Sequence, residues 1–230
     1  ATNYEFAYRA GTLVVARMPA SGVSLSKSTV TLKPGDTVRL SATVSPTNTT
    51  DKSLTWKSSK ASVATVAGGK VVAKKPGKAT ITVRTSNGKT ARCVVKVVLP
   101  AAHVTYRAHV QSSGWQGWKS DGALSGTKGK NKRLEAMRIK LKGAPYAGSI
   151  QYRSYVQSSG WQAWKSDGAV SGTTGKSKRL EAVQVRLKGR MATYYDVWYR
   201  VRVQRLGWMG WAKNGAKVGT RGYGYRVEAI

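Results

Sequence analysis

The sequence is short of several residue types, and each shortage excludes a class of protein. A single cysteine, Cys93, rules out a disulfide within the chain, and two histidines, His103 and His109, give no metal-ligand cluster of the usual spacing. No apolar run approaches the roughly 18 residues of a membrane-spanning helix. The start, ATNYEFAYRAG, lacks the basic-then-apolar pattern of a signal peptide, so we expect a mature segment or a cut fragment.

Acidic residues are also scarce, because nine Asp and Glu stand against 40 Lys and Arg, for a formal net charge of +31. Both halves of the chain are basic, so the charge belongs to the whole protein rather than to a tail. A field of this sign attracts polyanions in general. A purely solubilising role, or a generally basic proteome, is the alternative. No nucleic-acid motif or recognition helix is visible, so no specific nucleic-acid partner is expected.

What is present is enough apolar sequence, 40% of the residues, for the chain to fold, and its length favours two domains. Residues 21–46 alternate apolar and polar residues around a Pro-Gly-Asp turn at 34–36, which predicts strands. The alternation puts Val38, Leu40, Ala42 and Val44 on one face. About seven short strands in about 80 residues indicate an immunoglobulin-like sandwich.

Three runs carry a more specific resemblance: LTWKSSKASVATV (54–66), GKVVAKKPGKATITV (69–83) and SNGKTARCVVKV (86–97). With them, residues 22–98 resemble a bacterial Ig-like domain of group 2. The resemblance implies a spacer or adhesion module of bacterial surface and secreted proteins. We expect this domain at 22–99, with Trp56 as its large core side chain and Cys93 buried. Residues 1–21 are either an edge strand or the tail of a preceding module.

The remaining sequence repeats itself three times. Residues 105–143 and 151–189 are identical at 28 of 39 positions, and a third, more divergent copy follows. The shared marks are a Gly-Trp pair at 114, 160 and 207, a Gly-Thr pair at 126, 172 and 219, and Arg-x-Glu-Ala at 133, 179 and 226, with Asp-Gly at 121 and 167. The third copy has Asn214-Gly215 instead, which still suits a turn.

These marks resemble the clostridial hydrophobic repeat with a conserved tryptophan, found in tandem on secreted proteins of Gram-positive bacteria. The resemblance covers residues 103–142, 150–188 and 197–230 of a repeat domain at 100–230, and implies surface binding or substrate attachment. No helical period is present, so the whole chain is predicted to be all-β. Three units that cannot bury their apolar faces alone favour closure with pseudo-threefold symmetry, as in a β-prism or β-trefoil, over a linear stack.

The tryptophans and the Arg-x-Glu pair are the candidate site residues. Trp115, Trp161 and Trp208 are expected in the core. The candidates for stacking on a sugar ring are Trp118, Trp164 and Trp211, with Asp121, Asp167 and Asn214 as hydrogen-bonding groups. The alternative is that these tryptophans only hold the repeats together.

Strand alternation puts Arg133, Glu135, Met137, Ile139 and Leu141 on one face, and Leu134, Ala136, Arg138, Lys140 and Lys142 on the other. The Arg-x-Glu pair is therefore interpreted as a buried or half-buried ion pair that fixes the register, with a ligand site as the alternative. One identical acid per copy is not the carboxylate pair of a glycosidase. No nucleophile with a base, metal site or phosphate loop is visible, so no catalytic residue, metal or cofactor is expected.

The sequence thus predicts a non-enzymatic extracellular attachment module, secreted or attached to a cell surface, with the Ig-like domain as spacer. Its expected partners are a cell-surface glycan, teichoic acid or another polyanion, or a host surface protein. The alternative is a protein–protein interaction or assembly module of a larger protein. The candidate polyanion-binding residues are Lys128, Lys130, Lys132, Arg138, Lys140, Lys142, Lys176, Lys178, Arg186 and Lys188.

Overall fold

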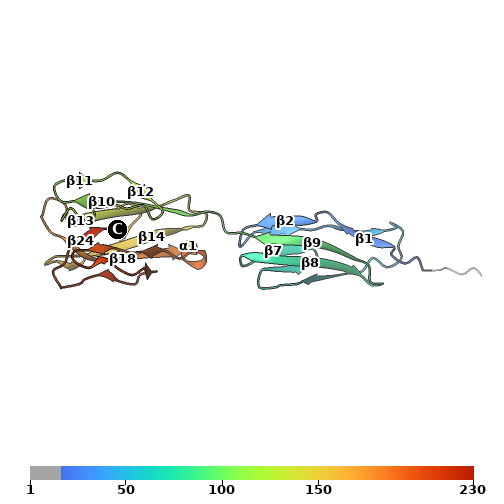
Figure 1. The fold of residues 1–230 in the computed structure, drawn as a ribbon. Coiled ribbons are helices and arrows are strands. Elements are labelled where there is room, and N and C mark those ends of the chain that lie inside the picture. The colour runs from blue at the N-terminus through green and yellow to red at the C-terminus, as the bar shows by residue number, and fades with distance from the viewer. Residues whose placement is uncertain (1–16) are drawn as a thin grey trace, which may run out of the picture. The chain divides into compact units, whose positions relative to one another are not determined.

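The computed structural model describes residues 17–230, so most of the predicted N-terminal segment 1–21 lies outside the described residues. The chain divides into two compact units between Leu99 and Pro100, and each is described by itself. Strands dominate both units, and one short helix, α1 (Arg190–Tyr194), occurs in the described part. The predicted all-β class is confirmed (Figure 1).

The first unit contains three sheets with the orders β1-β4, β2-β9-β8-β5 and β3-β7-β6. β2 runs parallel to β9, and the other pairs are antiparallel. The strands are β1 (Gly22–Leu25), β2 (Thr29–Leu32), β3 (Thr37–Arg39), β4 (Ala42–Ser45), β5 (Leu54–Ser58), β6 (Ala64–Ala67), β7 (Lys70–Ala73), β8 (Gly77–Thr85) and β9 (Thr90–Val97). This Ig-like unit agrees with the prediction.

The core of the first unit follows the alternation of β8 and β9. Cys93, Val95 and Val97 point inward together, and Cys93 is fully buried, where desolvation raises the pKa of its thiol. Trp56 packs against this core but is only half-buried. The predicted alternation is confirmed, because Val38, Leu40, Ala42 and Val44 are buried or half-buried while the residues between them are exposed, although the chain passes from one sheet to another between β3 and β4.

The second unit is built from three hairpin-like repeats. β10 pairs with β13, β14 with β18, and β20 with β24. The strands are β10 (His103–Val110), β11 (Gly114–Trp115), β12 (Lys119–Ser120), β13 (Leu134–Lys142), β14 (Gly148–Val156), β15 (Gly160–Trp161), β16 (Lys165–Ser166), β17 (Ser171–Gly172), β18 (Leu180–Gly189), β19 (Trp198–Tyr199), β20 (Arg202–Val203), β21 (Gly207–Trp208), β22 (Ala212–Lys213), β23 (Val218–Gly219) and β24 (Val227–Ala229).

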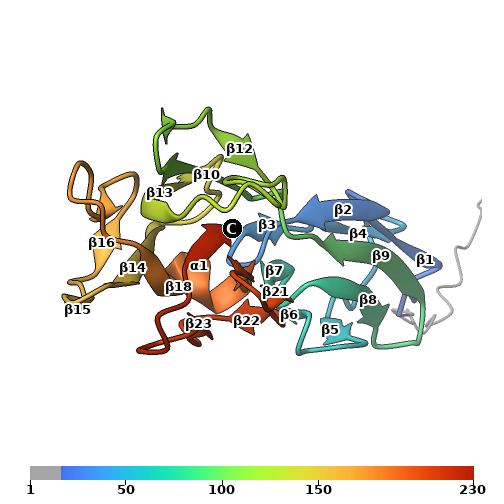
Figure 2. The same cartoon turned by 60° about the vertical axis from the view of Figure 1, so that its left-hand side comes forward.

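Each repeat lends a short segment to the sheet of another repeat. β17 of the second repeat pairs with β13 of the first, and β23 of the third pairs with β18 of the second. An isolated bridge between Gly126 and Ala229 joins the first repeat to the third in the same way. The repeats therefore form a ring, not a linear stack, and Figure 2 shows them arranged around the C-terminal end. The choice between prism and trefoil topology stays a prediction.

One apolar core serves the whole ring. Its buried members come from all three repeats, among them Leu134 of the first, Tyr152 and Leu180 of the second and Val227 of the third. Met191 of α1 joins the same cluster. Because the core is shared, each repeat depends on its neighbours for burial of its apolar face.

Candidate functional site

The Arg-x-Glu motif lies at a β-bulge in every repeat. In the first repeat Val110 pairs with Leu134 but His109 pairs with Ala136, so Glu135 is the extra residue. The registers of β14 with β18 and of β20 with β24 shift at the equivalent places, which makes Glu181 and Glu228 bulge residues too. The bulge breaks the predicted alternation.

The break changes which side chains enter the core. Leu134, predicted to share the face of the basic residues, is buried in the core together with Met137 and Ile139. The predicted assignment of Leu134 is therefore wrong. An uninterrupted period of two cannot anticipate the added residue, because a bulge inverts the phase of everything on one side of it.

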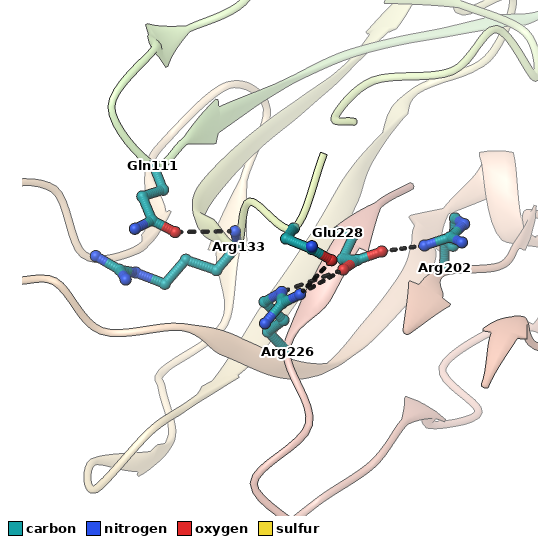
Figure 3. A network of polar contacts seen from close by, with 6 residues as sticks. Gln111, Arg133, Arg202, Arg226 and Glu228 are labelled. Atoms are coloured by element: carbon teal, nitrogen blue, oxygen red, sulfur yellow. Dashed lines mark hydrogen bonds and ion pairs between the residues drawn. The ribbon is translucent and has the colours of Figure 1, made fainter. Parts of the chain in front are cut away.

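The three bulge glutamates are buried and paired with arginine, as predicted. Glu135 contacts Arg133 at 2.7 Å, Glu181 contacts Arg179 at 2.9 Å, and Glu228 contacts Arg226 at 3.0 Å between Nη2 and Oε1. Figure 3 shows Glu228 held between Arg226 and a second arginine, Arg202. Hydrogen-bonded partners of this kind are what a buried carboxylate requires.

The backbone at each bulge forms the joint between repeats. The carbonyl of Glu135 accepts a hydrogen bond from the amide of Thr173 at 2.8 Å. Thr220 donates to Glu181, and Thr127 donates to Glu228, each also at 2.8 Å. The Gly-Thr and Arg-x-Glu motifs are thus the two halves of one contact, made three times around the ring.

The two tryptophans of each repeat hold an arginine between them and so form a tryptophan clamp. The Arg107 Cζ lies 5.0 Å from the ring centroids of both Trp115 and Trp118. Arg153 stands 4.9 Å from Trp161 and 4.8 Å from Trp164. In the third repeat, Arg200 makes the same pair of contacts with Trp208 and Trp211, at 4.6 and 4.7 Å. These distances suit cation–π attraction.

Two sequence-based expectations change as a result. Trp115, Trp161 and Trp208 were expected in the core, but all three are half-buried and belong to the clamp instead. The clamp arginines were missed, although a Tyr-Arg pair recurs at 106, 152 and 199 and is a usable signal. The tryptophans were misplaced because β11 is only two residues long, so the chain leaves the straight-strand geometry before it reaches the second tryptophan.

The candidate stacking residues differ in exposure and in coverage. Lys140 lies 4.3 Å above the Trp118 ring, and the Arg186 guanidinium lies 3.8 Å above Trp164. Trp118 is 39% exposed and Trp164 is half-buried. Trp211 is 55% exposed, and Arg200 is the one cation found over its ring in the described part of the chain.

Asp121, Asp167 and Asn214 are turn residues in the structure. Each has a positive φ, and each side-chain Oδ1 accepts a hydrogen bond from a strand amide: those of Val104, Ile150 and Val197, respectively, at 3.1, 3.1 and 2.9 Å. Because the bond needs an oxygen rather than a charge, asparagine serves as well as aspartate. Asp121 also contacts His103 at 2.7 Å, a hydrogen bond that lowers the pKa of its carboxyl.

The predicted polyanion-binding residues separate into two groups. The first group lies on β13 and β18, where Arg138, Lys140 and Arg186 stand over tryptophan rings; it comprises Arg138, Lys140, Lys142, Arg186 and Lys188. The other five lie in the loops before those strands, where Lys132 and Lys178 donate to the hydroxyls of Ser113 and Ser159. The loop group comprises Lys128, Lys130, Lys132, Lys176 and Lys178.

A pocket of about 360 Å³ opens between the first and third repeats. From the first repeat it takes Val104, Tyr106 and Asp121, and from the third it takes the segment 196–200 with Trp208 and Trp211. Trp198, which replaces Thr105 and Gln151 of the other repeats, is 57% exposed at its rim. Trp198 was not predicted as a site residue, although its departure from the repeat pattern is a usable signal.

Residues 17–230 contain neither a metal-binding cluster nor a membrane-spanning helix. No group of three or more His, Cys, Asp or Glu side chains in this range is placed to hold a metal ion. No helix among these residues has the length and apolar character needed to cross a membrane.

Comparison with known proteins finds two families that match different parts of the chain. The bacterial Ig-like domain (group 2) family matches residues 19–95, and the family described as clostridial hydrophobic W matches 109–143, 155–189 and 202–230. A minor capsid protein of Enterobacteria phage T3 is 48% identical over 82 residues, covering 36% of this chain and 18% of that protein.

Two further relatives are similar at this level. An uncharacterized protein of Clostridium acetobutylicum is 40% identical over 82 residues, with 34% of this chain and 21% of that protein covered. An Ig-like virion protein of Serratia phage KSP90 is 39% identical over 89 residues, with 37% and 34% covered. The chain therefore spans between 18% and 34% of the length of these relatives.

Among solved structures, the extracellular cadherin domains 1–4 of protocadherin gamma B7 cover 86% of this chain and 49% of their own, at 10% identity and a TM-score of 0.30. A similarity this low carries no argument here. The two family matches follow one another along the sequence in the order of the two structural units. The chain therefore carries a group 2 bacterial Ig-like domain followed by three clostridial hydrophobic W repeats.

Proposed function

We propose that this chain is a non-enzymatic attachment module of a surface or virion protein, and that its repeat unit binds an anionic polymer. The observation that supports this proposal most is the alternation of cations and tryptophans along the outer faces of the first two repeats. There Arg138 stacks on Trp115 and Lys140 on Trp118, and Arg186 stacks on Trp164. The net charge of +31 adds a long-range attraction for polyanions.

The cations stacked on the tryptophan rings favour an anionic ligand over a neutral sugar. Trp118 is covered by Arg107 and Lys140, so a sugar ring must displace a cation to reach the ring face. A phosphate or sulfate instead binds the cations where they stand, since stacking on an aromatic face leaves guanidinium N–H groups at the edge free to donate. The names of the phage relatives, a minor capsid protein and an Ig-like virion protein, support a place on an exposed surface.

The test compares two double variants that remove the same charge. Lys140→Gln with Arg186→Gln removes cations from the tryptophan faces, and Lys128→Gln with Lys176→Gln removes two from the loops. Binding of the full chain to teichoic acid, a sulfated glycan and a neutral glycan is measured at about 0.15 M and about 0.5 M salt, a range over which exposed charges become strongly screened. We expect the face variant to lose several-fold more affinity for the anionic polymers.

Two outcomes would contradict the proposal. Equal losses in both double variants mean that net charge alone attracts the polymer, without a site. Binding of the neutral glycan that persists at high salt and fails in Trp118→Ala means that sugar stacking, and not anion binding, is the mechanism.

A protein partner is the second candidate function, favoured by one observation. The pocket between the first and third repeats is lined mainly by apolar and aromatic side chains and differs from the cation-covered faces of the other repeats.

A further inference from the structure

The first repeat places two arginines directly opposite each other on the strands beside its tryptophan clamp. Arg107 of β10 pairs in register with Arg138 of β13. The Cβ atoms of such a pair lie about 4.5–5.5 Å apart, and the two side chains share one face of the sheet. Both guanidinium groups also lie 5.0 Å from the centre of the same ring, that of Trp115. Two like charges are therefore held together beside one aromatic ring.

Neither arginine of this pair has an acceptor for the N–H group at its Nε. The Nε atoms of Arg107 and Arg138 are buried, and among the described residues neither has a hydrogen-bond partner. No carboxylate in residues 17–230 forms an ion pair with either side chain. A guanidinium has N–H donors and no acceptor, so neither arginine can satisfy the other. Buried donors without acceptors, and like charges directly across a strand pair, are both unfavourable.

The second repeat shows how the same position is satisfied when one of the arginines is replaced. Gln184 occupies the place of Arg138 and lies opposite Arg153. The Gln184 Oε1 accepts a hydrogen bond from the Arg153 Nε at 2.7 Å, and the Gln184 Nε2 donates to the Gly215 carbonyl at 2.8 Å. Arg153 contacts both tryptophans of its repeat just as Arg107 does. The clamp itself therefore does not require a second arginine.

We propose that Arg107 and Arg138 together bind one tetrahedral oxyanion, a sulfate or phosphate group of the polymer, at a site that the second repeat lacks. This inference rests on the proposed binding of an anionic polymer and adds which group is bound and where. An oxyanion brings acceptor oxygens and opposite charge, and so supplies to both arginines what Gln184 supplies to its partner. Lys140 adds a third cation, because its Nζ lies 4.3 Å from the centre of the Trp118 ring, which Arg107 also contacts.

The opposed arginines suit a tetrahedral group better than a carboxylate. The two oxygens of a carboxylate lie in one plane and are both engaged when a single guanidinium binds them as a bidentate pair. The oxygens of a sulfate or phosphate diverge, so different oxygens reach different guanidinium groups. The arginine pair is therefore expected to prefer sulfate and phosphate to acetate.

The first experiment titrates the full chain with sodium sulfate at constant ionic strength and follows the arginine Nε–H signals by NMR. We expect saturable shifts of the Arg107 and Arg138 signals and no such shift of the Arg153 signal. Absence of these shifts, or an equal response to sodium acetate, overturns the proposal. A parallel titration with inorganic phosphate shows which of the two groups binds more tightly, and saturable binding of either one at this pair supports the proposal.

Exchange of residues between the repeats provides a matched variant. Arg138→Gln gives the first repeat the residue of the second, so its fold, checked by circular dichroism, is expected to be retained. We expect it to abolish the sulfate-dependent shift at Arg107 and to weaken binding of a sulfated glycan about tenfold, because charge-assisted hydrogen bonds are lost. Lys217→Gln removes one charge from an exposed position of the third repeat and should cost less than about twofold. Equal losses in the two variants overturn the proposal.

The reverse variant tests whether an opposed pair of arginines is sufficient. Gln184→Arg places a second arginine opposite Arg153, so a sulfate-dependent shift of the Arg153 signal is expected to appear. Such a gain cannot result from unfolding. A variant in which the Arg153 signal still does not respond overturns the proposal, since the pair would then not be what binds the anion.

The arginine site and the binding of a polymer can fail separately. Binding of teichoic acid or a sulfated glycan without any anion-dependent shift at Arg107 overturns the arginine site and leaves polymer binding standing. Saturable shifts at Arg107 and Arg138 in a chain that binds neither polymer overturn polymer binding and leave the anion site standing.

Discussion

Gly172 of the second repeat lies opposite Ala136 of the first, so close that a Cβ built on Gly172 would stand 2.5 Å from the Ala136 Cα and 2.4 Å from the Glu135 carbonyl oxygen. The φ angle of Gly172, 111°, is also one that residues with a side chain rarely adopt. Gly126 and Gly219 approach Ala229 and Ala182 in the same way. A residue without a side chain is therefore what allows the repeats to join.

Gly172→Ala is expected to destabilise the repeat unit by about 2–4 kcal/mol, because it combines overpacking with backbone strain. Chemical denaturation followed by tryptophan fluorescence measures the loss. Gly117→Ala is the matched control, since nothing lies within 4 Å of a Cβ at that position. A Gly172→Ala protein as stable as the control would show that the joint is looser than the structure indicates.

Glu181→Gln is expected to cost about 2 kcal/mol of unfolding free energy. The change leaves the Arg179 guanidinium beside a neutral group and weakens the hydrogen bond that Glu181 accepts from the Gly222 amide at 2.9 Å. Removing Arg179 as well should recover part of the loss, which a double-mutant cycle measures. Additive losses would mean that the two side chains do not stabilise each other.

Removing the third repeat is expected to unfold the other two. A chain that ends at Gly189 loses Val203 and Val227 from the shared core, and Gly126 loses its bridge to Ala229. Amide dispersion in an NMR spectrum of the shortened chain, compared with the full chain, gives the readout for residues 100–189. Well-dispersed signals from those residues would contradict a ring that needs all three repeats.

Arg153→Ala is expected to loosen the clamp in the second repeat, at a cost of about 1–2 kcal/mol, because two cation–π contacts are lost and the packing of the arginine stem goes with them. Trp161 and Trp164 become more accessible, which acrylamide quenching of fluorescence reports. Arg153→Lys keeps the charge but not the planar guanidinium, so its quenching should fall between that of the unchanged protein and that of Arg153→Ala. Unchanged quenching in Arg153→Ala would show that the tryptophans are held without it.

Alkaline pH is expected to destabilise the repeat unit. Burial raises the pKa of Tyr106, Tyr152 and Tyr199, whose hydroxyls donate to the carbonyls of Ala123, Ala169 and Ala216. Since the unfolded value is about 10, their contribution is complete below pH 10 and is lost as the pH rises through the higher folded values.

Phenolate absorbance and circular dichroism, followed together against pH, measure this effect. Unfolding should accompany the last phenols to ionise, and Tyr152→Phe should show a shallower loss of stability because one linked group is gone. Ionisation of every tyrosine with full retention of structure would contradict the expected linkage.

The amino-acid sequence alone was sufficient for the strand content, the two kinds of module and the Arg–Glu pairing. Period-two alternation and turn residues are local properties, and a motif written three times is visible without any structure. The pairing of Arg133 with Glu135 also follows from their closeness in sequence.

The tertiary structure decided what depends on contacts between distant segments. The bulge at Glu135 arises from the register of β13 against β10, and it moved Leu134 into the core. Arg107 meets Trp115 and Trp118 only because the chain turns back on β10. No local pattern encodes such relationships, since each is fixed by how one repeat packs against another.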